Sequence, residues 1–158
     1  MFDVAIIGAG PAGMIAAITA SNKGKSVALI DRNPQLGRKL LATGNGRCNI
    51  TNMNIGIDHY HGFDLAFIEN ILNRFDQYAT LKFFQDLGLI FKEEDNGRIF
   101  PRTNQASSVV EILKQRLIKN KVKILLDSLV VNIEKNAAWN ITFNDGKSIK
   151  ARKLILAT

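Results

Sequence analysis

The chain has 158 residues, of which 46% are hydrophobic and 22% charged, and it contains a single cysteine. This length and composition suffice for one buried core and exclude a disordered tail or a fibrous repeat, while one cysteine excludes an internal disulfide. The formal net charge of +7 is compatible with nucleic acid, anionic lipid or a phosphate-bearing cofactor, and without a Cys/His cluster we expect no metal site.

An uncharged run from Val4 to Asn22 is long enough to resemble a membrane-spanning helix or the core of a signal peptide. Asp3 stands where a signal peptide would carry positive charge, and the stretch Gly8–Pro11 would interrupt a helix in the middle of the run. We therefore expect a strand, a turn and a helix here, and no membrane among the partners. The lack of disulfides is typical of a reducing compartment, which favours a cytoplasmic location.

The first elements predict a right-handed βαβ unit. The apolar run Phe2–Ile7 predicts a buried parallel strand, Gly10–Asn22 predicts a helix with Pro11 in its first turn, and Ser26–Ile30 predicts a second strand. Periodicity then disappears from Arg32 to Gly62. This segment is expected to be a long loop, and long loops in compact domains are usually functional or disordered.

Two helices and a small hairpin are expected next. The helices are Leu65–Phe75 and Tyr78–Leu87, and the hairpin pairs Leu89–Lys92 with Arg98–Phe100 around the turn Asp95-Asn96-Gly97. A further helix is expected to begin after Asn104 as its N-cap and to run to about Lys119.

Strands dominate the last part of the chain. Val122–Leu126 predicts a third parallel strand, and Lys153–Thr158 predicts a last buried one. An antiparallel set is expected between them, formed by Leu129–Glu134, Trp139–Phe143 and Ser148–Ala151. The fold class is therefore α/β, with a central parallel sheet, a small antiparallel β-meander and inserted helices. Because the last strand has nothing after it to cover it, we expect residues 1–158 to be part of a longer protein.

The hexapeptide Gly8-Ala9-Gly10-Pro11-Ala12-Gly13 fits the pattern G-x-G-x-x-G. It follows a predicted strand and opens a predicted helix, and Asp31 lies about 20 residues further on, as in dinucleotide-binding sites. Gly8 permits the tight turn, Gly10 lets a diphosphate approach the backbone, and Gly13 lets the helix pack on the strand. Asp31 is expected to accept hydrogen bonds from both ribose hydroxyls of an adenosine.

The alternative to this interpretation is a glycine-rich turn in an unrelated α/β protein. Asp31 would repel a 2′-phosphate, which argues against NADP, although the neighbouring Arg32 is a cation. These residues do not separate FAD from NAD.

The segment Gly37–Asn52 combines the cations Arg38, Lys39 and Arg47 with glycines directly after this region, a composition suited to a diphosphate and a negatively polarised ring. Together with Val4–Gly13, Gly97–Pro101 and Leu154–Thr158, this segment resembles the bacterial aminoacetone oxidase-like flavoproteins, which are related to oxidoreductases with two dinucleotide-binding domains. The resemblance spans the whole chain. It implies a Rossmann-like domain that binds FAD.

The resemblance also implies which residues bind the cofactor. They are Gly8 to Gly13 at the diphosphate, Asp31 and Arg32 at the adenosine, Arg38, Lys39, Leu40 and Gly44 along the phosphates and ribityl chain, Val130 at the adenine edge, and Ala157 with Thr158 at the end of the last strand. The family commonly has Glu at the position of Asp31, and its later parts, which complete the flavin site and the substrate-facing domain, are absent here. The isolated segment is therefore expected to bind FAD weakly and to be inactive.

Other candidate residues keep two interpretations each. Cys48 is expected to be a small packed residue rather than a redox thiol, although Arg47 beside it could lower its pKa. The stretch Gly97–Arg102 suits either an anionic substrate or a solvated turn. His59 and His61 have no third ligand nearby, so metal binding is not expected.

The sequence thus predicts an FAD-dependent oxidoreductase, or its cofactor-binding portion, that acts on a small organic substrate such as an amine or an enone. NAD(P)H or oxygen would be the redox partner, and no residue is identified as catalytic. Two alternatives remain: a nucleic-acid-associated flavoprotein of the tRNA-modifying type, suggested by the positive charge, and a plain NAD-binding module.

Overall fold

The computed structural model describes all residues from Met1 to Thr158. The chain forms two compact units. The first contains Met1–Leu41 and Leu113–Thr158, and the second contains Ala42–Ile112. None of the helices combines the length and the apolar character needed to cross a membrane.

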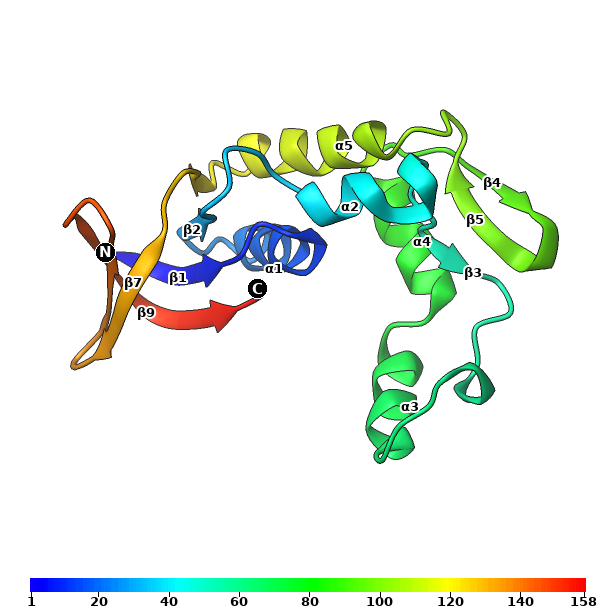
Figure 1. The fold of residues 1–158 in the computed structure, drawn as a ribbon, viewed down its shortest axis with the longest axis horizontal. Helices are drawn as coiled ribbons and strands as arrows, with labels where there is room; N and C mark the ends of the chain where they lie inside the picture. Colours follow the sequence, from blue (N-terminus) through cyan, green and yellow to red (C-terminus); the bar gives the residue numbers. More distant parts are fainter. The chain divides into compact units, whose positions relative to one another are not determined.

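The first unit is built on a six-stranded sheet with the order β6-β2-β1-β9-β8-β7. Strands β1, β2, β7 and β9 of this sheet are labelled in Figure 1. Strands β6, β2, β1 and the second half of β9 are parallel, whereas β9, β8 and β7 form an antiparallel meander. The strands are β1 (Phe2–Ile7), β2 (Val27–Ile30), β6 (Lys123–Leu125), β7 (Val130–Lys135), β8 (Trp139–Phe143) and β9 (Ser148–Leu156). The expected α/β class with a parallel sheet and a small meander is confirmed.

Helix α1 (Pro11–Asn22) connects β1 to β2 and packs on both strands. Met14 and Ile18, one turn apart, are fully buried, as are Ile6 of β1 and Leu29 of β2. Each such side chain contributes roughly 1.5–3 kcal/mol when it leaves water, so this face fixes the helix on the sheet. The predicted βαβ unit is confirmed, with Gly10 as the N-cap rather than the first helical residue.

Strand β9 corrects one prediction. Ser148–Ala151 and Lys153–Thr158 were expected to be separate strands, but the chain runs as a single strand from Ser148 to Leu156. Ala151 is fully buried where two partners meet, because it pairs with Trp139 of β8 on one side and with Phe2 of β1 on the other. Both pairings extend the same backbone, so no break is needed.

The second unit contains a three-stranded sheet with the order β3-β5-β4 and two helices. The elements are β3 (Thr51–Asn52), α3 (Leu65–Arg74), α4 (Gln77–Asp86), β4 (Phe91–Glu94) and β5 (Arg98–Pro101). The predicted helices and hairpin are confirmed, with β4 starting two residues later than expected. Each helix has an aspartate N-cap: the Asp64 carboxylate accepts the Phe67 N–H at 2.9 Å, and that of Asp76 accepts the Ala79 N–H at 2.8 Å.

The expected long loop from Arg32 to Gly62 is interrupted by short regular elements. It contains helix α2 (Arg38–Ala42), strand β3 and two short 3₁₀ turns, Thr43–Gly46 and Ile57–His59. These pieces are too short to produce a periodic pattern in a sequence window, because left-handed backbone at Gly37 and at Gly44–Gly46 redirects the chain every few residues.

The N-cap predicted at Asn104 is also wrong. Helix α5 runs from Ala106 to Lys119, and Asn104 lies two residues before it with a φ of 55°, whereas an N-cap residue normally has extended backbone. The buried stripe of this helix is as expected, since Val109, Leu113 and Leu117 are fully buried.

Candidate functional site

The turn between β1 and α1 is packed against the end of β9 by two glycines. Gly8 has a φ of +105°, and a side chain there would overlap the carbonyl oxygen of Ala157. A side chain at Gly13 would overlap the carbonyl oxygen of Gly8. The Ala157 N–H donates to the Ile7 carbonyl at 2.8 Å, which holds the two strand ends together. Internal packing therefore accounts for both glycines. Figure 1 shows β9 ending beside this turn.

Gly10 has no such internal explanation. Its φ of −71° and ψ of −178° are open to any residue, and no atom lies within 4 Å of the position that a Cβ would occupy. A glycine at this position keeps a space beside the backbone empty. The space suits a group from outside the protein that approaches the main chain, as the middle glycine of a dinucleotide fingerprint allows.

The N-terminus of α1 adds positive potential at that space. Gly10 provides no side-chain cap, in contrast to the aspartates that cap α3 and α4, and the first turn contains no acidic residue. Ala12 and Gly13 lie in the first turn, where N–H groups have no acceptor within the helix. These donors and the positive end of the helix dipole are suited to an anion such as a diphosphate.

Asp31 follows β2 and points back to this turn. Its Oδ2 accepts the Ala9 N–H at 2.6 Å, and its Oδ1 accepts both the backbone N–H and the side-chain Nδ2 of Asn33 at 2.8 Å each. A carboxylate has about four lone-pair positions, so about one remains, on Oδ2. Asp31 was expected to accept hydrogen bonds from two ribose hydroxyls, but most of its lone-pair positions already accept hydrogen bonds from the protein.

Asn33 and Gly37 connect this carboxylate to α2. The Arg38 guanidinium donates to Asn33 Oδ1 at 3.1 Å, and the Gly37 N–H donates to the Ala9 carbonyl at 2.9 Å. The start of α2 thus lies beside the glycine-rich turn, with the exposed side chain of Arg38 near Asp31. Sequence reasoning missed Asn33. The available signal was the Asp-x-Asn spacing, which is typical of a turn in which an aspartate accepts the N–H two residues on.

The segment before β7 borders the same region. The Ser128 N–H donates to the Asp31 carbonyl at 2.9 Å, and the Asp127 N–H donates to the Asn33 carbonyl at 3.2 Å. Val130, the first residue of β7, lies two residues after Ser128 and is half-buried. The carboxyl ends of β1, β2 and β9 therefore meet at one edge of the parallel sheet, where ligands of open α/β sheets bind.

The structure brings most predicted site residues of the first unit to this edge: Gly8 to Gly13, Asp31, Arg38, Val130, Ala157 and Thr158. Arg32 and Lys39 are exposed, and Leu40 is buried, with 5% of its surface exposed, so it offers only its backbone. Gly44 belongs to the second unit. A side chain at Gly44 would come within 2.7 Å of the Asn49 nitrogen, so loop packing accounts for it.

Arg47, in the segment Gly37–Asn52, was expected to suit a cofactor phosphate, but it is paired with another residue of the chain. Its guanidinium binds both oxygens of Glu94, at 3.0 and 2.9 Å, and lies 4.0 Å from the centre of the Phe100 ring. Lys92 also pairs with Glu94, at 2.7 Å. Hydrogen bonds from Lys92 and Arg47 lower the pKa of Glu94. Arg47 is thus paired within the second unit, although Glu94 is shared with Lys92 and the three side chains together keep one positive charge.

Cys48, beside Arg47, has the character of a packed residue. Only 5% of its surface is exposed, and burial raises the pKa of its thiol, with a smaller opposing effect of a hydrogen bond from Thr43. A reactive cysteine has a lowered pKa and partial exposure. Nowhere in the chain do three or more His, Cys, Asp or Glu side chains form a group that could hold a metal ion.

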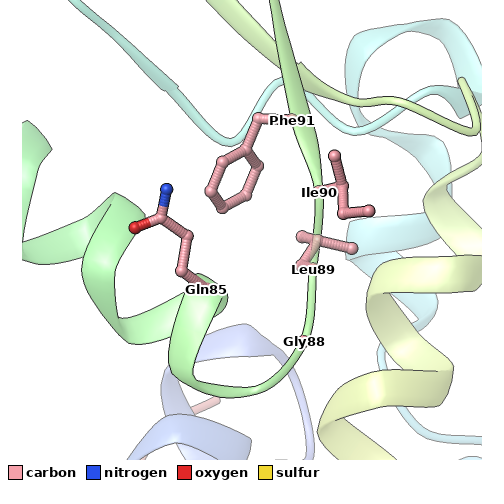
Figure 2. A pocket seen from close by; sticks show the side chains of 5 residues that line it. All are labelled: Gln85, Gly88, Leu89, Ile90 and Phe91. Atoms are coloured by element: carbon pink, nitrogen blue, oxygen red, sulfur yellow. The ribbon is translucent and has the colours of Figure 1, made fainter.

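A separate pocket of about 350 Å³ lies in the second unit, where α4 ends and β4 begins (Figure 2). It is lined by Gln85, Gly88, Leu89, Ile90 and Phe91. None of these residues is titratable or nucleophilic, so the pocket has no group for acid–base or covalent chemistry.

Comparisons with known proteins match the chain over nearly its whole length. The family model described as "HI0933-like protein Rossmann domain" matches residues 2–158. A 3-dehydro-bile acid delta(4,6)-reductase of Clostridium scindens is 40% identical over 159 residues, which cover 99% of this chain and 39% of that relative. A ribosomal RNA dihydrouridine synthase of Escherichia coli is 32% identical over 157 residues, again 99% of this chain and 39% of that relative. The chain thus spans well under half the length of both relatives.

Among solved structures, the open conformation of a flavocytochrome c3 fumarate reductase superposes with a TM-score of 0.68 at 20% identity. The match covers 99% of this chain and 33% of that one. At this identity the likeness shows the fold alone, and the predicted Rossmann-like fold is confirmed. The narrower resemblance to aminoacetone oxidase-like flavoproteins stays a prediction.

Proposed function

Since this chain belongs to the family of HI0933-like proteins, we propose that it is the cofactor-binding part of an FAD-dependent oxidoreductase. The open backbone at Gly10 carries the proposal, because neither φ nor packing requires a glycine there. Residues 1–158 would be the dinucleotide-binding part of a longer flavoprotein, as the 39% coverage of both relatives suggests.

The residues at the sheet edge fit an adenine dinucleotide. The first-turn N–H groups of Ala12 and Gly13 would donate to the diphosphate, and the Arg38 guanidinium would lie beside it. Asp31 would accept a ribose hydroxyl on its remaining lone pair, and its negative charge disfavours a 2′-phosphate. The Val130 backbone would face the adenine edge.

The remaining proposed contacts come from the end of β9 and from the segment between Arg32 and Gly44. Ala157 and Thr158, directly after β9, would border the diphosphate or the flavin because Ala157 packs on Gly8 and Gly13. Arg32, Lys39, Leu40 and Gly44 are proposed contacts on the resemblance alone. When bound, FAD would supply hydride transfer, while the chain holds and orients it.

Reduction of a carbon–carbon double bond is the proposed reaction class. The name of the relative that is 40% identical describes a reductase of a delta(4,6) bile acid derivative, which favours the enone over the amine among the expected substrates. A reductase needs an electron donor, and NAD(P)H is the donor we propose. Oxidation of small amines stays a weaker prediction from the sequence resemblance.

A second candidate is action on RNA. The relative that is 32% identical is named a ribosomal RNA dihydrouridine synthase, and this chain has a net charge of +7. Basic proteins bind RNA through phosphate contacts, and such binding weakens steeply with salt. Retention of ribosomal RNA that falls with a steep salt slope would favour this candidate over a small-molecule substrate.

The cofactor proposal is tested by titrating the chain separately with FAD, NAD and NADP and measuring binding by calorimetry. We expect FAD to bind most tightly and NADP most weakly. Tighter binding of NAD than of FAD would support a plain NAD-binding module, and no binding of any of the three would contradict the proposal.

A further inference from the structure

We infer that Asn33 is a positioning residue that orients Asp31 so that the carboxylate receives a single ribose hydroxyl of the adenosine half of the cofactor. The inference rests on the proposed function and deepens it. It concerns a residue outside the glycine fingerprint and outside every contact implied by the family resemblance.

All four polar groups of Asn33 are engaged. Its backbone N–H and its side-chain Nδ2 both donate to Asp31 Oδ1 at 2.8 Å. Its side-chain Oδ1 accepts from Arg38 at 3.1 Å, and its backbone carbonyl accepts from the Asp127 N–H at 3.2 Å. The amide orientation is unambiguous, because the opposite one would place its oxygen against a carboxylate and its nitrogen against a guanidinium.

These bonds join three segments that are distant in the sequence. The first segment is the glycine-rich turn, whose Ala9 N–H donates to Asp31. The second is α2, which begins at Arg38, and the third is the segment with Asp127, before the strand that begins at Val130. Asn33 therefore links Asp31 to the start of α2 and to the segment that precedes Val130. A substitution there should alter how the cofactor is held.

The Asp31 carboxylate has too few free lone pairs to accept hydrogen bonds from both ribose hydroxyls. Asn33 occupies both positions on Asp31 Oδ1, and Ala9 occupies one on Oδ2. One position on Oδ2 is left of about four. A ribose carries two hydroxyls, so one should bind the carboxylate and the other should not.

A purely structural turn is the competing explanation. In that case the Asp31–Asn33 contact stabilises the end of β2, and its loss weakens binding of every ligand of the site by the same factor. A positioning role instead changes how strongly one particular hydroxyl is recognised. The two explanations therefore differ in what a substitution at Asn33 does to the ratio between the affinity for a ligand with that hydroxyl and the affinity for a ligand without it. The affinity for a single ligand does not separate them.

The first measurement compares ADP, 2′-deoxy-ADP and 3′-deoxy-ADP binding to the unaltered chain by calorimetry. We expect one deoxy analogue to bind about tenfold or more weakly than ADP, as for a lost hydrogen bond to a charged group, and the other to bind within about threefold. Equal losses for both analogues, or no loss for either, would overturn the inference. This step needs no variant.

The second measurement repeats the series with Asn33→Asp, which keeps an acceptor for Arg38 but replaces the donor to Asp31 by a second carboxylate oxygen. The unaltered chain should bind ADP about tenfold more tightly than the weaker-binding deoxy analogue. In Asn33→Asp this ratio of affinities should fall below about threefold. Asn136→Asp is the matched control, because Asn136 is exposed in the turn between β7 and β8 and gives the same change in charge. An unchanged ratio in Asn33→Asp, or an equal change in Asn136→Asp, would refute a positioning role.

Failure of the proposed function is distinguishable from failure of this inference. If the unaltered chain binds neither FAD nor ADP, both fall. If FAD and ADP bind but the ratios do not behave as stated, only the role of Asn33 is wrong.

Discussion

Substitution of Gly10 by valine separates ligand binding from folding at the proposed cofactor site. The Cβ position at Gly10 has no neighbour within 4 Å, and a φ of −71° suits valine, so the folded chain has room for the new side chain. Two opposing effects of about 0.5–1 kcal/mol each act on stability. Valine makes the unfolded chain less flexible, which stabilises the folded state, and it is a poorer N-cap for α1 than glycine, which destabilises it. The free energy of unfolding should therefore change by less than about 1 kcal/mol, or about 2–4 °C in Tm.

Cofactor binding should respond very differently. The valine methyl groups would fill the space through which a diphosphate reaches the main chain, which removes one or two hydrogen bonds to a charged group. Each is worth about 1.5–3 kcal/mol, so FAD affinity should fall by between about tenfold, for one weak bond, and about 10⁴-fold, for two strong ones. FAD titration followed by flavin fluorescence, together with thermal unfolding of the same sample, measures both quantities.

Gly56→Val is the matched control. Gly56 is also the first residue before a helical turn, has extended backbone, and has nothing within 4 Å of its Cβ position, but it lies in the second unit. It should leave both Tm and FAD affinity near the values of the unaltered chain. FAD affinity that is unchanged in Gly10→Val, or reduced equally in Gly56→Val, would refute the diphosphate assignment.

Further predictions concern packing and charge. Gly13→Ala should destabilise the chain by about 1–3 kcal/mol, because its Cβ would overlap the Gly8 carbonyl oxygen; a thermal midpoint equal to that of the unaltered chain would contradict this packing. The pKa of Glu94 is lowered by hydrogen bonds from Lys92 and Arg47, so its contribution to stability is present above the unfolded pKa and is lost as the pH falls through the folded one. The difference in urea midpoint between the unaltered chain and Glu94→Gln should therefore shrink from about pH 7 to about pH 3, and a constant difference would argue against the Glu94 pairs. Because burial raises the pKa of Cys48, a thiol reagent should modify the native chain at least about tenfold more slowly than the urea-unfolded chain, and equal rates would indicate an exposed thiolate.

Local patterns accounted for what could be predicted from the sequence. The strand, glycine-rich turn and helix from Phe2 to Asn22 follow one another along the chain, so composition and spacing predict them directly. The burial of Met14 and Ile18 on one helix face is likewise a local periodicity. These are also the parts that position the candidate site.

Contacts between distant segments could not be predicted in this way. Strand β9 is continuous because it pairs with β8 and with β1 at once, and neither pairing is visible in its own residues. Asn33 has its partners in a turn, a helix and a loop that only the fold brings together. Arg47 was expected to be available to a cofactor phosphate, but its guanidinium pairs with Glu94, far along the chain.

Amide NMR spectra of the isotopically labelled chain, recorded with and without FAD, test the central claim most directly. The largest shift changes should fall on the backbone N–H groups of Gly10, Ala12 and Gly13 and on those of the Asp31–Asn33 turn. The N–H groups that line the pocket at Gly88 and Leu89 should stay in place. Saturable changes confined to other residues, or no changes at millimolar FAD, would contradict binding of the cofactor diphosphate at the start of α1.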